Sequence, residues 1–414
     1  MPQLDVSFIR TQFPAFSSSH AKEWAFFENA GGSYVAKQVL EKLNHYNTAT
    51  RVQPYGPSTP SAEAGEAMDR SYRLLAEMLS VAEQELMLGP STSINSYVMA
   101  QAIAPELKAG DEVIITNQDH EANVGAWNRL DRTGATIKVW QVDPQTGLLD
   151  LDNLNELLNE NTKLACFTHC SNIAAQIIDI KTAVQLCHNV GAKVVVDGVS
   201  YAPHALPDLK ALGVDAYFFS LYKTYGPHLW LMYVQKEWLR TLANQGHFFN
   251  EDKSLRYRLT PTGPQHAQIA CASGIADYYD AVYEHHFDTP KENRQARGKD
   301  VSVLFQEQEQ KQSKLIVDYL LAKADVMLVG PQTADYTVRA PTLAFFSAKQ
   351  SSAEIVRGLT QHKIATNHGH FYAYRLIKAL GLDLEDGVVR LSLVHYTSED
   401  DARRAVEALE AVLI

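Results

Sequence analysis

An aspartate and a lysine each follow a short apolar run in the middle of the chain. Val194–Val196 is wholly β-branched, which is typical of a strand buried on both faces of a parallel sheet, and Asp197 comes directly after it. A second apolar run, Ala216–Phe219, leads to Lys223. Open α/β sheets bind ligands at the carboxyl ends of their strands. We therefore expect Asp197 and Lys223 to lie at the same edge of one sheet.

Two kinds of chemistry fit this pair. Burial lowers the pKa of a lysine and makes its amine nucleophilic, so Lys223 could trap an aldehyde while Asp197 pairs with a protonated ring nitrogen. Those are the two protein groups that a pyridoxal phosphate site requires. A buried ion pair without a catalytic role explains the same two residues equally well.

The composition narrows the class of protein. A chain of 414 residues predicts two domains, and 46% hydrophobic with 21% charged residues is typical of a globular protein. The net charge of −11, with no basic tract, argues against nucleic acid or an anionic membrane as partner. The four cysteines form no zinc pattern and predict buried free thiols in a reducing cytoplasm. We find neither a signal peptide nor an apolar run long enough to cross a bilayer.

Strands and helices alternate through the first half of the chain. Strands are expected from residue 86 and at 112–116, 136–141, 163–168, 194–196 and 216–219, with helices at 123–133, 151–158 and 180–189. This alternation predicts a largely parallel sheet covered on both sides. Right-handed crossovers would bring the strand ends to one edge, and with them His120, Asn172, Asp197 and Lys223.

The chain changes character after residue 267. Two long helices, expected at 269–285 and 293–321, precede short strands and helices that predict a smaller α+β unit. We expect three parts: an N-terminal segment (1–20) that packs with the small domain, a large domain (21–285) and a small C-terminal domain (286–414). The polar run Glu307–Lys314 is expected on a solvated helix face.

Two further stretches suit a ligand. Gly89-Pro90 turns into a helix that begins at Ser91 and Thr92, where exposed amides and the helix dipole favour an anion; an ordinary N-cap is the alternative. Asn29-Ala-Gly-Gly32 allows close backbone approach, either to a ligand or within a turn.

Taken together, these motifs resemble the class V aminotransferases, the fold-type I pyridoxal phosphate branch that contains cysteine desulfurases, selenocysteine lyases and isopenicillin epimerases. The matching stretches span nearly the whole chain, in order: 29–32, 89–95, 119–124, 169–172, 197–198, 220–226 and 389–396. The resemblance implies an α/β fold whose large domain has a mostly parallel seven-stranded sheet, beside a smaller C-terminal α+β domain. It implies pyridoxal 5'-phosphate as cofactor.

The resemblance also assigns roles around the cofactor. Lys223 becomes the Schiff-base lysine, Asp197 the partner of the pyridinium nitrogen, His120 the ring that stacks on the cofactor and exchanges protons, and Asn172 a neighbour of the phenolic oxygen. Without the other motifs, His120 would be interpreted as a surface or core histidine and Asn172 as a turn residue at the end of a strand. The phosphate would be held by Ser91, Thr92, Ser220 and Tyr222.

Substrate and subunit contacts follow in the same way. Arg390 corresponds to the arginine that grips the α-carboxylate of a small amino acid, which suits a planar guanidinium, and Asn29 and His370 are assigned to the substrate side. Thr262 corresponds to a threonine that reaches the phosphate of the neighbouring subunit, which implies a homodimer with shared active sites.

Two departures from the desulfurase pattern bear on the reaction. The stretch 364–372 contains no cysteine where desulfurases carry their nucleophile, and Ser200 stands where they usually hold a glutamine, a place that Gln176 or water could fill. His368 and His370 occupy the cysteine loop and could protonate a leaving group; loop histidines without a catalytic role are the equal alternative. A metal site there is rejected, because no third ligand has a suitable spacing.

The expected activity is therefore a lyase-type elimination on a small α-amino acid. A true aminotransferase, exchanging an amino group with a 2-oxo acid, is the alternative, and a cofactor-binding protein without catalysis is a third hypothesis. The sequence does not choose among elimination, transamination and epimerisation.

Overall fold

The computed structural model describes residues 2–250, 254–261 and 263–414. Its larger sheet has seven strands in the order β2-β8-β7-β6-β5-β3-β4. The strands are β2 (Leu86–Gly89), β3 (Glu112–Thr116), β4 (Thr136–Trp140), β5 (Thr162–Thr168), β6 (Lys193–Asp197), β7 (Ala216–Ser220) and β8 (Trp230–Val234). The run from β7 to β4 is parallel, whereas β8 is antiparallel to β7 and to β2. The expected mostly parallel seven-stranded sheet is confirmed, and β8 is a strand that was not expected.

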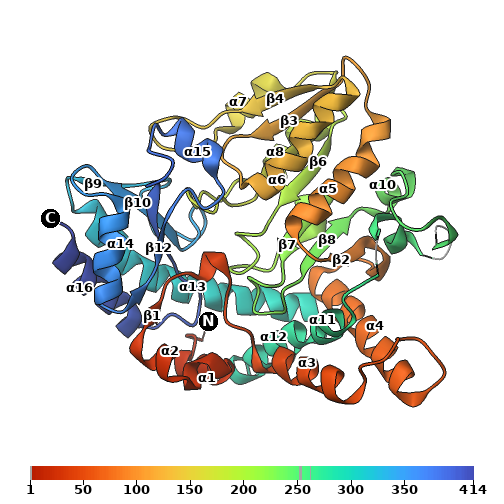
Figure 1. Ribbon diagram of the computed structural model, residues 1–414, viewed down its shortest axis with the longest axis horizontal. Coiled ribbons are helices and arrows are strands. Elements are labelled where there is room, and N and C mark those ends of the chain that lie inside the picture. Colours follow the sequence, from red (N-terminus) through yellow and green to blue (C-terminus); the bar gives the residue numbers. More distant parts are fainter. Residues whose placement is uncertain (1, 251–253, 262) are drawn as a thin grey trace.

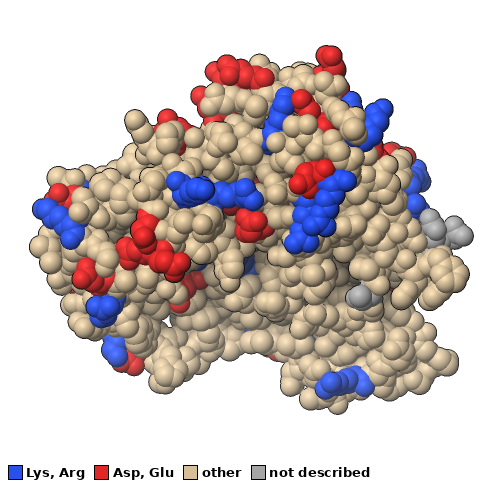
Figure 2. Space-filling model, turned by 45° about the horizontal axis from the view of Figure 1, so that its top comes forward, with Lys and Arg blue, Asp and Glu red and all other residues tan. Residues whose placement is uncertain are grey.

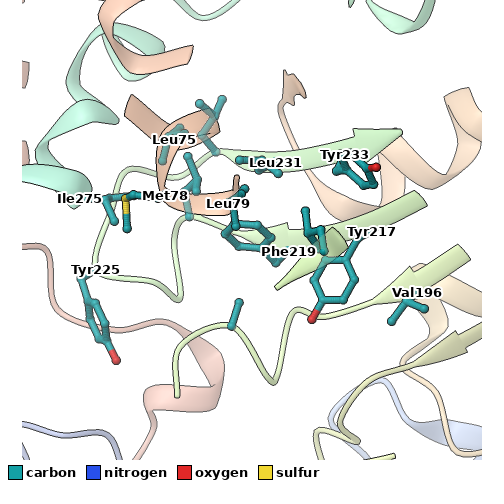
Figure 3. Packing of buried hydrophobic residues seen from close by; sticks show 14 of the residues in the cluster. Leu75, Met78, Leu79, Val196, Tyr217, Phe219, Tyr225, Leu231, Tyr233 and Ile275 are labelled. Atoms are coloured by element: carbon teal, nitrogen blue, oxygen red, sulfur yellow. The ribbon is translucent and has the colours of Figure 1, made fainter. Parts of the chain in front are cut away.

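Helices cover both faces of this sheet. Successive strand residues point to opposite faces, so strands that are apolar throughout need cover on both. Tyr217 and Phe219 pack in one apolar cluster with α4 (Thr59–Leu79) and α12 (Ser273–His286), as Figure 3 shows for Leu75, Leu79 and Ile275. Phe218, between them, packs in a second cluster with α5 (Thr92–Ile103) and α6 (Glu121–Asn128). The sheet is thus buried on both faces, as the wholly apolar strands predict.

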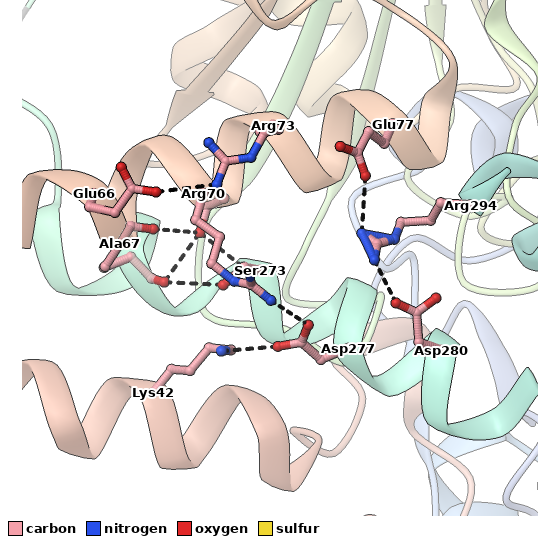
Figure 4. A network of polar contacts seen from close by, with 12 residues as sticks. Lys42, Glu66, Ala67, Arg70, Arg73, Glu77, Ser273, Asp277, Asp280 and Arg294 are labelled. Atoms are coloured by element: carbon pink, nitrogen blue, oxygen red, sulfur yellow. Dashed lines mark hydrogen bonds and ion pairs between the residues drawn. The ribbon is translucent and has the colours of Figure 1, made fainter. Parts of the chain in front are cut away.

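An ionic network joins the helices of the first layer (Figure 4). Asp277 on α12 pairs with Lys42 of α3 (Lys37–Ala49) at 2.9 Å and with Arg70 of α4 at 3.1 Å. Arg294, the first residue of α13 (Arg294–Leu321), bridges Glu77 of α4 and Asp280 of α12. These side chains are partly solvated, so each pair stabilises the fold by only about 0–1 kcal/mol.

A second sheet lies beside the first (Figure 1). It has four antiparallel strands in the order β12-β13-β10-β9. They are β9 (Val326–Leu328), β10 (Thr342–Ser347), β12 (Asn367–Gly369) and β13 (Val388–Ser392). Helices α14 (Ser352–Gln361) and α16 (Glu399–Val412) pack with them, and α15 (Tyr374–Ala379) follows β12.

Residues near the N-terminus contact this second unit. Strand β1 (Ala25–Phe26) pairs in parallel with β11 (Ile364–Ala365). Before it, Arg10 of α1 (Val6–Thr11) forms an ion pair with Asp401 of α16 and donates to the carbonyl of Tyr396 at 3.0 Å. In Figure 1 the red N-terminal helices accordingly lie near the blue C-terminal elements.

One expectation about α13 is only partly met. In the polar run Glu307–Lys314, Glu307, Lys311 and Lys314 are exposed, but Gln308, Glu309, Gln312 and Ser313 are buried. The helix is covered by α12 on one side and by α16 and β9 on another. Two of its buried polar side chains have partners outside the helix: one Glu309 carboxylate oxygen lies 3.0 Å from Nδ1 of His204, and Gln308 Nε2 donates to the carbonyl of Thr397 at 3.1 Å. Within this run, polar residue type therefore did not predict which side chains are exposed, because the helix packs between two units.

The expectation of buried free thiols is confirmed. The four cysteines are free and buried. Among the residues described, no helix is both long and apolar enough to cross a membrane. On the face shown in Figure 2, basic and acidic side chains are interspersed.

Candidate active site

A cavity of about 400 Å³ opens at the carboxyl ends of β5, β6 and β7, against Arg390 of β13. It gathers side chains from distant parts of the chain. Of the residues singled out from the sequence, those that line it are Ser91, Thr92, His120, Asn172, Asp197, Ser200, Tyr222, Lys223 and Arg390. The strand-end argument therefore located the cavity.

Asp197 and Lys223 face this cavity without touching each other. Asp197 ends β6, and its Oδ1 accepts a hydrogen bond from the backbone N–H of Val199 at 2.8 Å. Burial raises the pKa of Asp197 to about 6, and burial together with the charge of Arg390 lowers the pKa of Lys223 to about 8. No ion pair joins Asp197 to Lys223 in the described chain. The buried ion pair, the alternative interpretation of these residues, is therefore not formed.

The turn that carries Lys223 is held by the glycine-rich stretch near the N-terminus. Ser33 Oγ donates to the carbonyl of Tyr222 at 3.3 Å and accepts from the N–H of Tyr225 at 3.0 Å. Gly32 has a φ of +151°, and a Cβ there would lie 2.2 Å from the Tyr222 ring. Gly32 thus serves close packing against the lysine turn, while Gly31 lines the cavity itself.

His120 is the N-cap of α6. Its Nδ1 accepts from the backbone N–H of Ala122 at 3.0 Å, which leaves the ring proton on Nε2. Burial, reinforced by the charge of Lys223, lowers the pKa of His120 to about 3. A neutral ring can lie against an apolar aromatic face without the cost of burying a charge.

Polar atoms without partners mark where a ligand would be held. Thr92 Oγ1, Ser220 Oγ and Asn172 Oδ1 are buried and have no hydrogen bond. Buried polar groups are normally satisfied, so three such oxygens around one region indicate missing ligand contacts. Thr92 opens α5 behind its N-cap Ser91, where helix amides offer donors to an anion. This set fits a phosphate and a polar ring.

Arg390 is buried on β13. Its Nη1 donates to the carbonyl of Asn172 at 3.3 Å, and its guanidinium carbon lies 3.8 Å from the ring centre of Phe371. Burial lowers the pKa of Arg390 to about 10, so it remains charged at neutral pH. The guanidinium is therefore available to a carboxylate inside the cavity.

Other singled-out residues lie outside the cavity lining. The Asn29 amide donates to the carbonyl of Ser392 at 2.8 Å and accepts from the Tyr396 hydroxyl. Ser220 is not among the lining residues. His370 Nδ1 accepts from the N–H of Tyr372 at 3.0 Å. Gln176, suggested as a substitute for the missing glutamine, bonds instead with Gln118 and Leu149. Thr262 lies outside the described residues.

Several cavity residues were missed by sequence reasoning. They are Glu28, Trp230, Asn367, Phe371 and Tyr372. Glu28 directly precedes the stretch 29–32, and Phe371 and Tyr372 lie within the stretch 364–372. Their closeness in sequence to these motifs is the signal that could have identified them. Trp230 offered none, because β8 was not expected. In the part of the chain described, no group of three or more His, Cys, Asp or Glu side chains could hold a metal ion.

The sheet, the strand-end cavity and its aspartate and lysine define a fold-type I pyridoxal phosphate enzyme. Residues 25–265 match the family model described as Aminotransferase class-V. The chain is 35% identical to an aminotransferase-like protein of Gibberella zeae over 98% of both chains, and 29% identical to a cysteine desulfurase-like protein of Aspergillus flavus over 99% of this chain and 91% of that one.

A solved structure has the same fold. A cysteine desulfurase of Escherichia coli superposes with a TM-score of 0.82 at 22% identity, covering 99% of this chain and 98% of that one. The chain belongs to the class V aminotransferase family and is a pyridoxal phosphate-dependent enzyme.

Proposed function

We propose that the protein catalyses a lyase-type elimination on a small α-amino acid. The observation that carries this proposal is the cavity in which a buried lysine amine and a buried guanidinium face the same space, with no cysteine on the adjoining loop. The guanidinium suits the α-carboxylate and the amine suits a proton from the α-carbon.

The cofactor would be held by residues already in place. Thr92, Ser91 and the first amides of α5 would hold the phosphate, together with Ser220 and Tyr222. Asp197 would pair with the ring nitrogen, and His120 would lie against the ring. When bound, pyridoxal phosphate supplies an aldehyde that captures amines and a ring that withdraws electrons from the substrate α-carbon.

The chain's own groups then divide the work. Arg390 binds the carboxylate and orients the amino acid. Lys223, whose pKa is about 8, is partly neutral near physiological pH, so its Nζ can accept a proton at the α-carbon and return one. Asp197, largely ionised above pH 6, stabilises positive charge at the ring nitrogen.

The cysteines favour elimination over desulfuration through a protein persulfide. Only Cys170 lines the cavity among the residues described. Burial raises the pKa of Cys170 to about 12, so it remains a thiol, and thiols are poor nucleophiles. His370 does not line the cavity, so a role as acid needs its ring to turn toward the cavity, and we propose that role only in that form.

The test is product analysis with the purified, cofactor-loaded protein. Elimination from an amino acid with a β-leaving group gives a 2-oxo acid and ammonia without any acceptor. The name of the Gibberella zeae relative keeps an aminotransferase as the alternative. Accumulation of the aminated cofactor, reversed by adding a 2-oxo acid, would refute elimination. A wild-type protein that stays colourless after cofactor is added would refute both.

We further propose a cytoplasmic homodimer with shared active sites, in which Thr262 reaches the neighbouring phosphate, and the division of the chain into parts 1–20, 21–285 and 286–414. The ion pair between Arg10 of α1 and Asp401 of α16 supports grouping the N-terminal segment with the small domain. Mixing inactive Lys223→Ala and Thr262→Ala proteins tests the sharing. Restored activity on subunit exchange is expected, and two independent sites would give none.

A further inference from the structure

Two consecutive aromatic residues beside the cavity have left-handed backbone conformations. Phe371 has a φ of 43° and Tyr372 a φ of 61°, a region that bulky L-residues rarely occupy. Such strain persists only where the surroundings hold it, and it occurs most often at ligand sites.

Hydrogen bonds from the large-sheet side hold this segment. Asn172 Nδ2 donates to the carbonyl of Phe371 at 2.9 Å, and the N–H of Glu121 donates to the carbonyl of Tyr372 at 2.8 Å. Asn172 comes just after β5, and Glu121 opens α6. Hydrogen bonds therefore hold Phe371 and Tyr372 against the part of the chain that forms the site.

The ring of Phe371 is stacked on Arg390. The guanidinium carbon lies 3.8 Å from the ring centre, within the range of a cation–π contact. The guanidinium is otherwise weakly fixed. Within the described part of the chain its one hydrogen bond, to the carbonyl of Asn172, is 3.3 Å long, and its buried Nε has no partner. Guanidinium donors lie in the plane of the group, so a ring against its face blocks none of them.

We propose that Phe371 is a positioning residue for Arg390. Its ring fixes the plane in which the guanidinium meets the substrate carboxylate, and Asn172 fixes the ring by binding the strained carbonyl. The inference rests on the proposed function, because it takes Arg390 as the carboxylate ligand. It predicts that Phe371 affects only ligands that carry a carboxylate.

The experiment compares two probes on the cofactor-loaded enzyme. L-Alanine has a carboxylate and no β-leaving group, and ethylamine is the same amine without the carboxylate. The concentration that gives half of the change in cofactor absorbance measures each affinity. Phe371→Leu keeps an apolar side chain but loses the ring. It should lower the affinity for L-alanine roughly three- to thirtyfold and leave the affinity for ethylamine unchanged. Phe371→Tyr should retain the wild-type affinity.

A double-mutant cycle shows whether Phe371 acts through Arg390. In an Arg390→Ala background, Phe371→Leu should change the L-alanine affinity by no more than about twofold. Tyr374→Leu, on a partly exposed ring just beyond the strained pair, is the matched control and should match wild type. The melting temperature and cofactor absorbance of each variant confirm folding.

The possible failures are distinct. Equal weakening of L-alanine and ethylamine by Phe371→Leu, or an undiminished effect in the Arg390→Ala background, would overturn the positioning role while wild type still binds cofactor. If neither amine changes the cofactor absorbance of the wild-type enzyme, the proposed function is overturned, and the inference with it.

Discussion

Replacing Asp197 with asparagine should stabilise the cofactor-free protein and weaken the effect of the cofactor. Burial raises the pKa of Asp197 from 3.8 to about 6 in the structure, so above pH 6 the folded chain holds an ionised carboxylate in an unfavourable place. The difference in pKa corresponds to a cost of about 3 kcal/mol. Asp197→Asn removes it, so its cofactor-free form should unfold at higher temperature than wild type at pH 8.

The sign of the pH dependence follows from the raised pKa. Below pH 3.8 the carboxyl is protonated in both states and costs little; the cost grows as the pH rises from about 4 to about 6 and is then constant. The advantage of Asp197→Asn should therefore shrink as the pH is lowered from 6 to 4. Bound cofactor should reverse the order, because its cationic ring nitrogen stabilises Asp197 and not asparagine.

The assay is thermal unfolding with and without pyridoxal phosphate across pH 4–8. Asp143→Asn is the control of opposite sign, because hydrogen bonds from Thr146 lower the pKa of Asp143, and its removal should destabilise the protein at pH 8. The assignment of Asp197 is refuted if cofactor-free Asp197→Asn has a lower melting temperature than cofactor-free wild type at pH 8. It is also refuted if the cofactor raises the melting temperature of Asp197→Asn as much as that of wild type.

Three further predictions follow from the site and the fold. The rate of cofactor attachment to Lys223, trapped with borohydride and located by peptide mass, should rise with pH to half its maximum near pH 8; a pH-independent rate would contradict a buried amine. Gly32→Ala should lower cofactor affinity at least about tenfold, because a 2.2 Å contact with Tyr222 displaces the lysine turn, whereas Gly110→Ala, with open space around it, should not. Arg339→Leu should destabilise the chain by about 3–5 kcal/mol in urea unfolding, since three carbonyls lose a buried charged donor; a smaller loss would mean that water replaces it.

Much of the site could be predicted because strands and their ends are local features. The apolar run Val194–Val196 predicts a buried strand, and Asp197 must then lie at the carboxyl edge wherever the strand sits in the sheet. The same reasoning placed Asn172 and Lys223 at neighbouring ends. Strand β8 was missed because an apolar run after a turn fits a strand or a buried helix equally well.

Side-chain environment was less accessible to sequence reasoning. Glu309 lies in a polar run, yet packing between two units buries it against His204. Asn29 was assigned to the substrate side, but its amide is engaged by Ser392 and Tyr396, more than 360 positions away in the chain. Such partners are set by how distant elements meet, and no local pattern encodes that.

By itself, the sequence determined the alternation of strands and helices, the resemblance to the class V aminotransferases, and the residues at the strand ends. Tertiary structure alone decided that Asp197 and Lys223 stand apart instead of pairing, and that Phe371 covers Arg390. The physical reason is that apolar periodicity and turn chemistry act over a few residues, whereas burial, charge separation and ring stacking depend on segments brought together only when the two sheets pack.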